Sequence, residues 1–334
     1  MDARTAPRVA PDDADGPAVD PAVDPGMPVR RARYAPRHPL HLHKILSPMA
    51  RGGDGPCLRR TATGAWITMR APTGPVTLHL EQDADGIAAE AWGPGAEWAL
   101  DGVPELLGSR DDWSDIDLSP SPLLTEVRRR NPGLRLGRNR LVFEMLVPSI
   151  LEQKVTAVEA WAAWRLLVRR HGSPAPGPAP DGMVVAPAAD TWRLIPSWEW
   201  HTAGVGPQRS ESAVRASRVA VALQRTVTGA GSILDEAAEA SVRLRSLPGI
   251  GVWTAAEVTS RAHGDPDAVS VGDYHLASTV GMALTGSPVD DDGMLELLAP
   301  WAGQRQRVLR LILLSGITKP RRGPRITIQD HRRH

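Results

Sequence analysis

Residues 247–255 read Leu-Pro-Gly-Ile-Gly-Val-Trp-Thr-Ala. Apolar residues recur at helical spacing on both sides, over 235–246 and 252–263, so the stretch predicts two helices joined by a tight turn. Gly249 and Gly251 would let the backbone of this turn approach another surface closely. The N–H groups of the turn and of the second helix would then face outward, where a phosphate oxygen accepts them. The alternative is a turn that only joins two helices.

The next chemical signal is Asp273, within the sequence Ala-Val-Ser-Val-Gly-Asp-Tyr-His-Leu at 268–276. It stands where a short extended segment enters a helix predicted at 274–284. An aspartate in this place commonly caps the helix. A cap and a catalytic role are compatible, because helix N–H groups favour an ionised carboxylate. Such a charge stabilises the oxocarbenium-like sugar that forms when a base leaves its glycosidic bond.

The chain from 121 to 317 is predicted to be helical, because apolar residues recur there at helical spacing and strand signals are nearly absent. Two apolar runs, at 141–151 and 156–170, are separated by a short break. Thr156 with Glu159 three residues later fits a capping box, which predicts that the second helix starts there. The Pro- and Gly-rich stretch 173–187 is predicted as a surface loop, and further helices are predicted at 209–225, 235–246, 252–263, 274–284 and 293–315.

The N-terminal third has a different pattern. Residues 1–30 lack periodicity and resemble a disordered leader. Short alternating runs at 65–70 and 75–82, separated by Gly and Pro, predict antiparallel strands. The predicted organisation is therefore a leader, a β-rich domain that ends in an acidic connector, a larger helical domain and a basic tail. Their predicted bounds are 1–30, 31–120, 121–317 and 318–334.

Composition excludes several classes of protein. A single cysteine, Cys57, excludes a disulfide framework, a cysteine-based zinc site and a four-cysteine iron–sulfur cluster, and it favours a reducing compartment. The N-terminus lacks a signal-peptide pattern and no apolar run is long enough to span a membrane. We therefore expect a cytoplasmic protein with no membrane partner and no metal held by side chains. The formal net charge of +1 indicates no particular partner, but arginines cluster at 128–140 in a pattern suited to phosphate. Solvated surface charge is the alternative reading of that cluster.

Three segments together resemble the helix-hairpin-helix DNA glycosylase superfamily, and within it the 3-methyladenine DNA glycosylase II (AlkA-type) group. They are PGLRLGRNRLVFEMLVPSILEQKVTAVEAW at 132–161, LPGIGVWTA at 247–255 and VSVGDYHLASTVG at 269–281. They follow the order and spacing of the family, and the resemblance covers roughly 120–316. It implies a mainly α fold, with an all-α glycosylase domain of the HhH-GPD type after a smaller β-rich domain.

The resemblance assigns roles to two of these segments. Gly249, Ile250 and Gly251 match the hairpin that holds a DNA phosphate, often with a bound monovalent cation such as Na⁺ or K⁺. Asp273 matches the catalytic aspartate of the superfamily. No other cofactor is implied. The implied partner is double-stranded DNA with a damaged base.

The turn between the helices predicted at 141–151 and 156–170 matches the wedge that fills the gap left by a flipped base. The AlkA-type group usually has an apolar residue there, whereas this chain has Gln153 and Lys154. Which of the two fills the gap stays open, and the alternative is a solvated turn lysine.

Trp253 stands where superfamily members that also cut the DNA backbone have a lysine, which forms a Schiff base with the sugar. The resemblance therefore implies a water nucleophile and a monofunctional enzyme that leaves an abasic site. Trp253 is alternatively a core residue under the hairpin.

The base pocket is predicted from Tyr274, Trp301, Trp253 and Glu257. Alkylated purines such as 3-methyladenine are cationic and are attracted to aromatic faces. Tyr274 and Trp301 match aromatic pocket positions of the family, with core packing as the alternative, whereas Glu257 stands where relatives have an aromatic residue.

The sequence therefore predicts a monomeric base-excision-repair glycosylase, cytoplasmic and associated with the nucleoid, that removes an alkylated purine. The alternative is a catalytically inactive helix-hairpin-helix protein that only binds duplex DNA. A pure binder has no need of a carboxylate facing DNA, so Asp273 favours the enzyme.

Overall fold

The structure of the chain, a computed structural model, describes residues 28–53 and 55–318. It is mainly helical, with one five-stranded and one two-stranded antiparallel sheet. The predicted leader and basic tail fall almost entirely on residues 1–27 and 319–334, which lie outside the described residues. Among the helices of the described part, none has the length and apolar character needed to cross a membrane.

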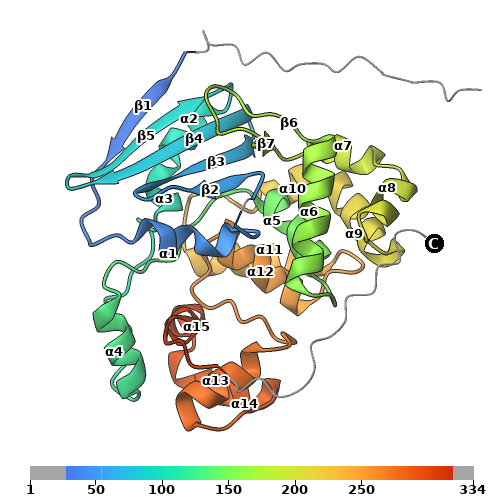
Figure 1. Ribbon diagram of the computed structural model, residues 1–334. Helices are drawn as coiled ribbons and strands as arrows, with labels where there is room; N and C mark the ends of the chain where they lie inside the picture. The colour runs from blue at the N-terminus through green and yellow to red at the C-terminus, as the bar shows by residue number, and fades with distance from the viewer. Residues whose placement is uncertain (1–27, 54, 319–334) are drawn as a thin grey trace, which may run out of the picture.

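The five-stranded sheet forms the N-terminal part of the molecule (Figure 1). Val76, Leu78 and Leu80 alternate along its fourth strand and are fully buried, because a strand repeats every two residues and turns this set to one face. Short helices pack on that face and close the core. The elements are β1 (Arg30–Tyr34), α1 (Leu42–Leu46), the 3-10 turn η1 (Ser47–Met49), β2 (Leu58–Arg60), β3 (Gly64–Ala71), β4 (Gly74–Asp83), β5 (Gly86–Trp92), α2 (Ala96–Asp101) and α3 (Val103–Leu106), with sheet order β1-β5-β4-β3-β2.

Helices dominate the rest of the described chain. Most of the predicted helices are present within a few residues of their expected bounds. The elements are α4 (Pro122–Arg130), α5 (Val142–Leu151), α6 (Ala157–His171), β6 (Ser173–Pro174), β7 (Val184–Val185), α7 (Ala189–Leu194), α8 (Ser197–Thr202), α9 (Pro207–Arg218), α10 (Ala220–Gln224), α11 (Ile233–Arg245), α12 (Val252–Ala262), α13 (Leu276–Thr285), α14 (Asp291–Leu298), the 3-10 turn η2 (Ala299–Trp301) and α15 (Arg305–Leu314).

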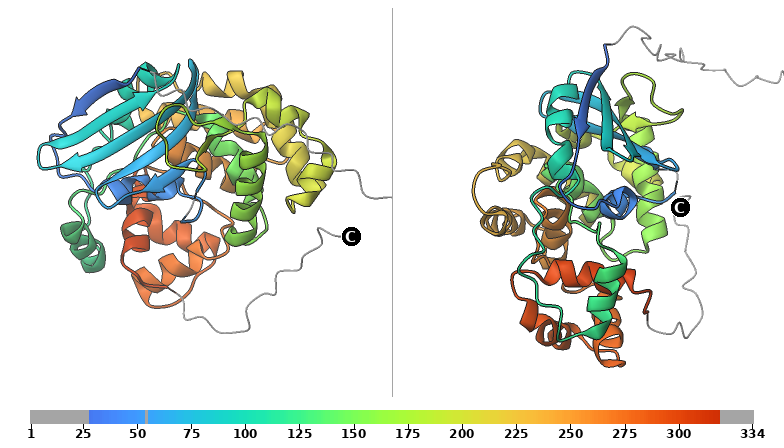
Figure 2. Two further views of the ribbon diagram at one scale, coloured as in Figure 1. Left: turned by 45° about the horizontal axis from the view of Figure 1, so that its top comes forward. Right: turned by 90° about the vertical axis from the view of Figure 1, so that its left-hand side faces the viewer.

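The helical part has two separate apolar cores. Helices α5 to α12 share one of them, which includes Leu146 and Val258. Helices α4, α13, α14 and α15 share the other, which includes Val280 and Ile312. The second group forms a lobe of its own below α12 (Figures 1 and 2). The residues predicted as one helical domain over 121–317 are thus divided between two hydrophobic clusters.

Three predicted elements differ from the structure. The helix predicted over 209–225 is divided into α9 and α10 at Val219. The stretch 173–187, predicted as a surface loop, forms β6 and β7 and packs against the large sheet. At Gly177 the backbone lies so close to Trp92 that a Cβ would collide with the indole ring. The helix predicted over 293–315 is interrupted between α14 and α15, where Gly303 has a φ of +85°.

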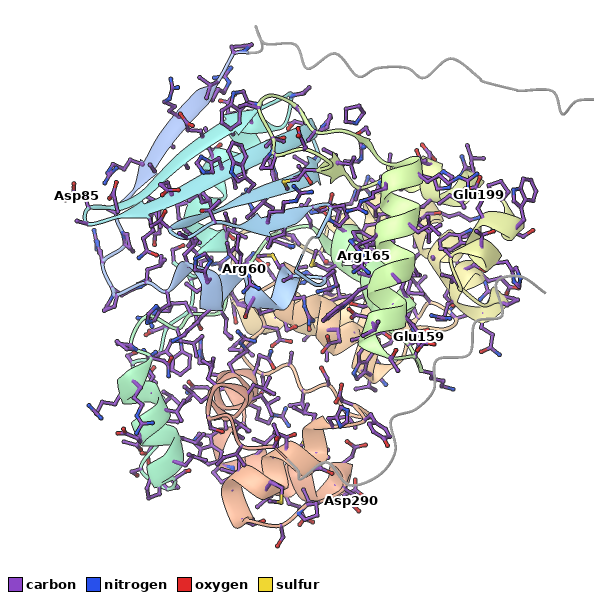
Figure 3. The ribbon with its side chains drawn as sticks, in the orientation of Figure 1. Arg60, Asp85, Glu159, Arg165, Glu199 and Asp290 are labelled. Atoms are coloured by element: carbon purple, nitrogen blue, oxygen red, sulfur yellow. The ribbon has the colours of Figure 1, made fainter. Side chains whose placement is uncertain are left out.

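The capping box predicted at the start of α6 is confirmed. Thr156 Oγ1 accepts a hydrogen bond from the Glu159 N–H at 3.3 Å, and Glu159 Oε2 accepts one from the Thr156 N–H at 2.9 Å. Figure 3 shows Glu159 at the lower end of α6, next to the turn that follows α5. The exchange satisfies two N–H groups that a first helical turn otherwise leaves without partners.

One buried carboxylate joins three segments of the chain. Asp111 accepts hydrogen bonds from Trp113 Nε1 at 2.5 Å, from the Leu136 N–H at 2.7 Å and from Arg307 Nε at 2.7 Å. The side chains of Asp111 and Arg307 are only 2% and 9% exposed. Because a buried charge is stable only with partners, this carboxylate fixes the connector, the segment 135–137 and α15 relative to one another.

We predict that Asp111→Ala destabilises the protein by about 3–5 kcal/mol, because it leaves the Arg307 charge buried without its carboxylate. The matched control is Asp112→Ala. Asp112 is exposed and bonds only to Ser114 among the described residues, so its loss should change the unfolding free energy by about 0.5 kcal/mol or less. Urea unfolding measures both variants. Equal stability of the two would contradict the role given to Asp111.

Candidate active site

A pocket of about 220 Å³ lies at the start of α13. Its walls come from α1 and η1 of the N-terminal part, from the segment 135–137, from α12, from the turn into α13 and from α15. Sites for drug-sized ligands are larger, at about 300–1,000 Å³. The volume therefore suits a single small ring system. Elements far apart in the sequence must be in place before this pocket exists.

The Asp273 carboxylate is part of the pocket wall. Its Oδ1 accepts hydrogen bonds from the N–H groups of His275 and Leu276, both at 2.9 Å. Its Oδ2 accepts one from Trp253 Nε1 at 3.2 Å. Asp273 thus caps the start of α13 and lines the pocket at the same time, the combination that the sequence predicts. Because three donors from two helices hold it, the carboxylate has a fixed position.

Glu257, on α12, is a second carboxylate in the wall, and both of its oxygens are engaged. Oε2 lies 2.7 Å from Arg261 Nη2, and Oε1 accepts a hydrogen bond from Ser270 Oγ at 2.5 Å. Burial raises the pKa of Glu257, but the charges of Arg261 and Arg51 and the Ser270 hydrogen bond outweigh burial and bring the pKa below its ordinary value. The carboxylate is therefore ionised at neutral pH and balances the charge of Arg261.

Helix α15 contributes one face to the pocket, with Gln306, Leu309, Arg310 and Leu313. This spacing is that of neighbours along one side of a helix. Arg310 Nη2 donates to the Lys44 carbonyl at 2.9 Å and to Ser47 Oγ at 3.1 Å. Burial, together with the nearby Arg261, lowers the pKa of Arg310 to about 10, so the guanidinium stays charged at neutral pH.

The predicted hairpin joins α11 to α12 as expected. Gly249 has a φ of +92°, and a Cβ there would collide with the Ser212 hydroxyl, so only glycine fits. Gly251 has open space where a Cβ would stand. Among the described residues, nothing accepts a hydrogen bond from the backbone N–H groups of Gly251 and Val252, which are both exposed. The start of α12 thus presents unsatisfied donors to solvent, as an anion site requires.

The turn between α5 and α6 is tied to this hairpin by Gln153. Its Nε2 donates to the Gly249 carbonyl and to Thr254 Oγ1, each at 2.9 Å. Lys154 is exposed and has a φ of +55°, a backbone conformation that few residues other than glycine adopt. Since Gln153 is occupied by the hairpin, Lys154 is the residue of the pair whose side chain is left for contact with a partner.

The aromatic residues predicted for the base pocket do not line it. Trp301 is buried in the core of the lobe around α13 to α15, where its Nε1 donates to the Asp117 carbonyl at 2.7 Å. Tyr274 is 85% exposed. Trp253 donates its Nε1–H to Asp273 but is not one of the residues that line the pocket. Of the four predicted pocket residues, only Glu257 is part of the lining.

Sequence reasoning missed three walls of the pocket. Ile45, Pro48 and Met49 come from the N-terminal part, and Arg135 lies in the segment before α5. The face of α15 that includes Arg310 is visible as a helical repeat. No local pattern shows that these side chains meet, because their contact depends on how the cores pack together.

No group of three or more His, Cys, Asp and Glu side chains within the described part of the chain could hold a metal ion. The acidic run at 290–292 caps a helix: Asp290 Oδ1 accepts from the Gly293 N–H at 2.9 Å, at the start of α14 (Figure 3). The hairpin carbonyls of Leu247 and Gly249 each accept one hydrogen bond and keep a second lone pair. A monovalent cation at the hairpin fits these groups.

No family model matches the chain, and no curated protein matches it in sequence. Solved structures do match it. A 3-methyladenine DNA glycosylase from Archaeoglobus fulgidus is 17% identical and superposes with a TM-score of 0.69, covering 86% of this chain and 98% of its own.

Two further structures contain DNA. The 8-oxoguanine glycosylase/lyase of Clostridium acetobutylicum, in complex with double-stranded DNA containing cytosine opposite 8-oxoguanine, is 14% identical, with a TM-score of 0.61 over 83% of this chain and 91% of its own. MBOgg1 in complex with a low-affinity DNA ligand is 13% identical, with a TM-score of 0.63 over 86% of this chain and 95% of its own. The chain therefore has the fold of the helix-hairpin-helix DNA glycosylases.

Proposed function

We propose that the protein is a base-excision-repair DNA glycosylase that hydrolyses the N-glycosidic bond of a damaged base turned out of double-stranded DNA. The observation that carries the proposal is the Asp273 carboxylate, held by three donors in the wall of a pocket that suits one small ring system. The fold is that of enzymes with this activity. We expect the protein to act as a monomer on nucleoid DNA in the cytoplasm.

The proposed reaction breaks the bond between C1′ of the sugar and the base nitrogen, and the bonding electrons leave with the base. The sugar then carries positive charge, which the fixed negative charge of Asp273 stabilises because it needs no rearrangement as the bond breaks. A water molecule adds its oxygen to C1′ and loses a proton, which neutralises a base that has left as an anion or passes to solvent when the base leaves as a neutral molecule. The products are the free base and an abasic site.

The absence of a lysine from the pocket lining supports a water nucleophile. The chain has three lysines, Lys44, Lys154 and Lys319. Lys44 donates its Nζ to Asn131 at 2.5 Å, Lys154 lies on the turn after α5, and Lys319 is outside the described residues. Since none of the lining residues is a lysine, no amine from the described chain is in place to form a Schiff base with the sugar.

The exposed hairpin and turn supply the proposed contacts with DNA. The free N–H groups of Gly251 and Val252 would bind one phosphate and position the duplex without reading its sequence. Lys154, presented by a turn that Gln153 anchors to the same hairpin, would fill the space left by the flipped nucleotide. The hairpin and the turn after α5, joined by Gln153, would then bind the DNA backbone and keep the flipped base out of the DNA duplex.

The prediction of an alkylated purine as substrate rests on aromatic walls. The pocket lining contains no Phe, Tyr or Trp side chain among the described residues, so this part of the sequence-based prediction lacks support from the structure.

We predict that Asp273→Asn lowers the rate of base release by about 10²- to 10³-fold, the scale expected for loss of one preorganised electrostatic group, while DNA binding persists. The matched control is Asp290→Asn, because Asp290 also caps a helix but does not line the pocket. Release is measured from alkali-revealed strand breaks and binding by gel shift. A wild-type rate in the Asp273 variant would contradict the assignment, and a wild-type protein that binds duplex but releases no base would favour the inactive binder.

A second prediction concerns the nucleophile. Strand breaks should appear only after alkali or heat, because water leaves an abasic site intact. Borohydride added during turnover should trap no covalent protein–DNA adduct. An adduct in the wild type would show that an amine is the nucleophile, and mass spectrometry of the adduct would identify it.

A third prediction tests the hairpin. Gly251→Leu should leave the fold intact, because nothing stands where its Cβ would project, but should block the approach of a phosphate. Affinity should fall by a similar factor for damaged and undamaged duplexes, since a phosphate contact carries no base information. The salt dependence should change little, because neutral N–H groups release few counterions. Binding isotherms at several salt concentrations decide the question. Loss of lesion preference with unchanged affinity for plain duplex would place the hairpin in base recognition instead.

A further inference from the structure

The charges around the pocket differ from those that a cationic base would require. Its lining includes three arginines, Arg135, Arg261 and Arg310, against two carboxylates, Asp273 and Glu257. Glu257 forms a 2.7 Å ion pair with Arg261. In the proposed reaction, the negative charge of Asp273 is balanced by the positive charge that develops on the sugar. The lining thus carries more positive than negative charge, and this excess would repel a positively charged base.

Arg135 and Arg310 both keep unused hydrogen-bonding capacity. Among the described residues only Nη1 of Arg135 has partners, and its Nε is buried without one. Arg310, unlike Arg135, has no nitrogen that is both buried and without a partner. A guanidinium has five N–H donors. Only Nη2 of Arg310 has partners among the described residues, the Lys44 carbonyl and Ser47 Oγ. No carboxylate in the described part of the chain lies within ion-pair distance of it. Its Nε and Nη1 are absent from the buried polar atoms that lack a partner, so neither nitrogen is fully buried, and Arg310 is one of the residues that line the pocket.

A purely structural role for Arg310 would account for Nη2 but not for the rest of the side chain. The two acceptors of Nη2 lie at the end of α1, where a basic side chain commonly caps free carbonyls. Arg261, in the same wall, is an arginine whose guanidinium nitrogens are all bonded within the protein. Its Nε, Nη1 and Nη2 all have partners, which are Pro48 and Glu257. Arg310 is held by one nitrogen and presents the others.

We propose that this pocket selects a neutral base that turns a carbonyl oxygen toward Arg310, an oxidised or deaminated base rather than a cationic N-alkylated purine. This inference rests on the proposed glycosylase function. Glu257 and Ser270 lie in the same lining. Their oxygens already bond to Arg261 and to each other, but each keeps a further lone pair that can accept from the N–H groups beside a carbonyl in such bases.

The chemistry of the leaving group gives Arg310 a second task. A cationic base departs as a neutral molecule and needs little help. A neutral base takes the electron pair of the broken C1′–N bond and departs as an anion, whose negative charge spreads to its carbonyl oxygen. A guanidinium at that oxygen stabilises the charge as it develops. Asp273 and Arg310 would thus act on opposite charges of the same transition state, the sugar cation and the base anion.

The test compares bases within one duplex sequence. Single hypoxanthine, 8-oxoguanine and uracil are the neutral bases with a carbonyl oxygen, and 3-methyladenine is the cation without one. The wild type should release at least one of the carbonyl bases faster than 3-methyladenine. Release of 3-methyladenine alone would overturn the inference and leave the proposed function standing.

Arg310→Met keeps much of the side-chain volume and removes the charge. It should lower kcat for the preferred carbonyl base about 10- to 100-fold, the scale of one hydrogen bond from a charged donor, and should leave release of 3-methyladenine unchanged or raise it. The matched control is Arg305→Met on the same helix, which breaks the 2.5 Å ion pair of Arg305 with Asp267 outside the pocket. Arg310→Lys keeps a cation and should be intermediate. An equal loss for all bases, or an equal loss in the Arg305 variant, would show a structural role and overturn the inference.

Binding separates this inference from the proposed reaction. If no duplex loses a base, the glycosylase proposal is contradicted, and base recognition is judged from affinity alone. Asp273→Asn protein should then bind the duplex with the preferred carbonyl base more tightly than the duplex with 3-methyladenine, and Arg310→Met added to it should abolish that difference. Equal affinity for all duplexes before the second substitution would contradict the inference.

Discussion

The structure depends on the buried carboxylate of Asp111. Its hydrogen bonds to Leu136 and Arg307 connect the segment 135–137 to α15, and both of these line the pocket beside Asp273. The same carboxylate accepts a hydrogen bond from Trp113 Nε1, which also fixes the position of the connector that follows the sheet. Since a buried aspartate and arginine are tolerated only when their donors and acceptors are satisfied, these three segments have one stable arrangement. The distance between the two walls of the pocket follows from it.

Local patterns in the sequence predicted the parts of the fold that local physics determines. The capping box of Thr156 and Glu159, the hairpin of Gly249 and the helix cap of Asp273 each depend on residues within a few positions of one another, and each is present. The division of the helices between two cores was not predicted. Helical periodicity shows which face of a helix is buried but not which neighbour buries it, so the partners of α13 and α15 had no signature. The strands β6 and β7 were missed because Pro and Gly, which usually mark a surface loop, here allow the chain to lie close to Trp92.

The candidate site also has one part that a local sequence pattern predicts and another part that depends on tertiary packing. Asp273 was predicted because its place at a helix start and its likeness to a motif coincide in one short segment, and it lies in the pocket wall. The walls were predicted as mainly aromatic residues near that motif, and Tyr274, Trp301 and Trp253 do not line this pocket. Trp301 lies in a core and Tyr274 in solvent, whereas the charged groups that meet at the pocket come from the segment 135–137, α12, the turn into α13 and α15. A charged residue such as Arg310 carries no local mark that separates a pocket lining from a solvated surface. Its neighbours in space, not in sequence, decide its role.

The contact of Arg310 with Lys44 and Ser47 joins residues 266 and 263 positions apart. During synthesis the sheet and the first helical core can assemble on the ribosome well before α15 emerges, since domains generally fold as units from the N-terminal end. The exposed hairpin would then be ready to bind nucleic acid while the pocket still lacked one wall. A nascent or truncated chain of this kind would hold on to duplex without completing the cavity beside Asp273. The pocket is thus complete only when α15, the last helix of the described residues, has packed against α1 and α12.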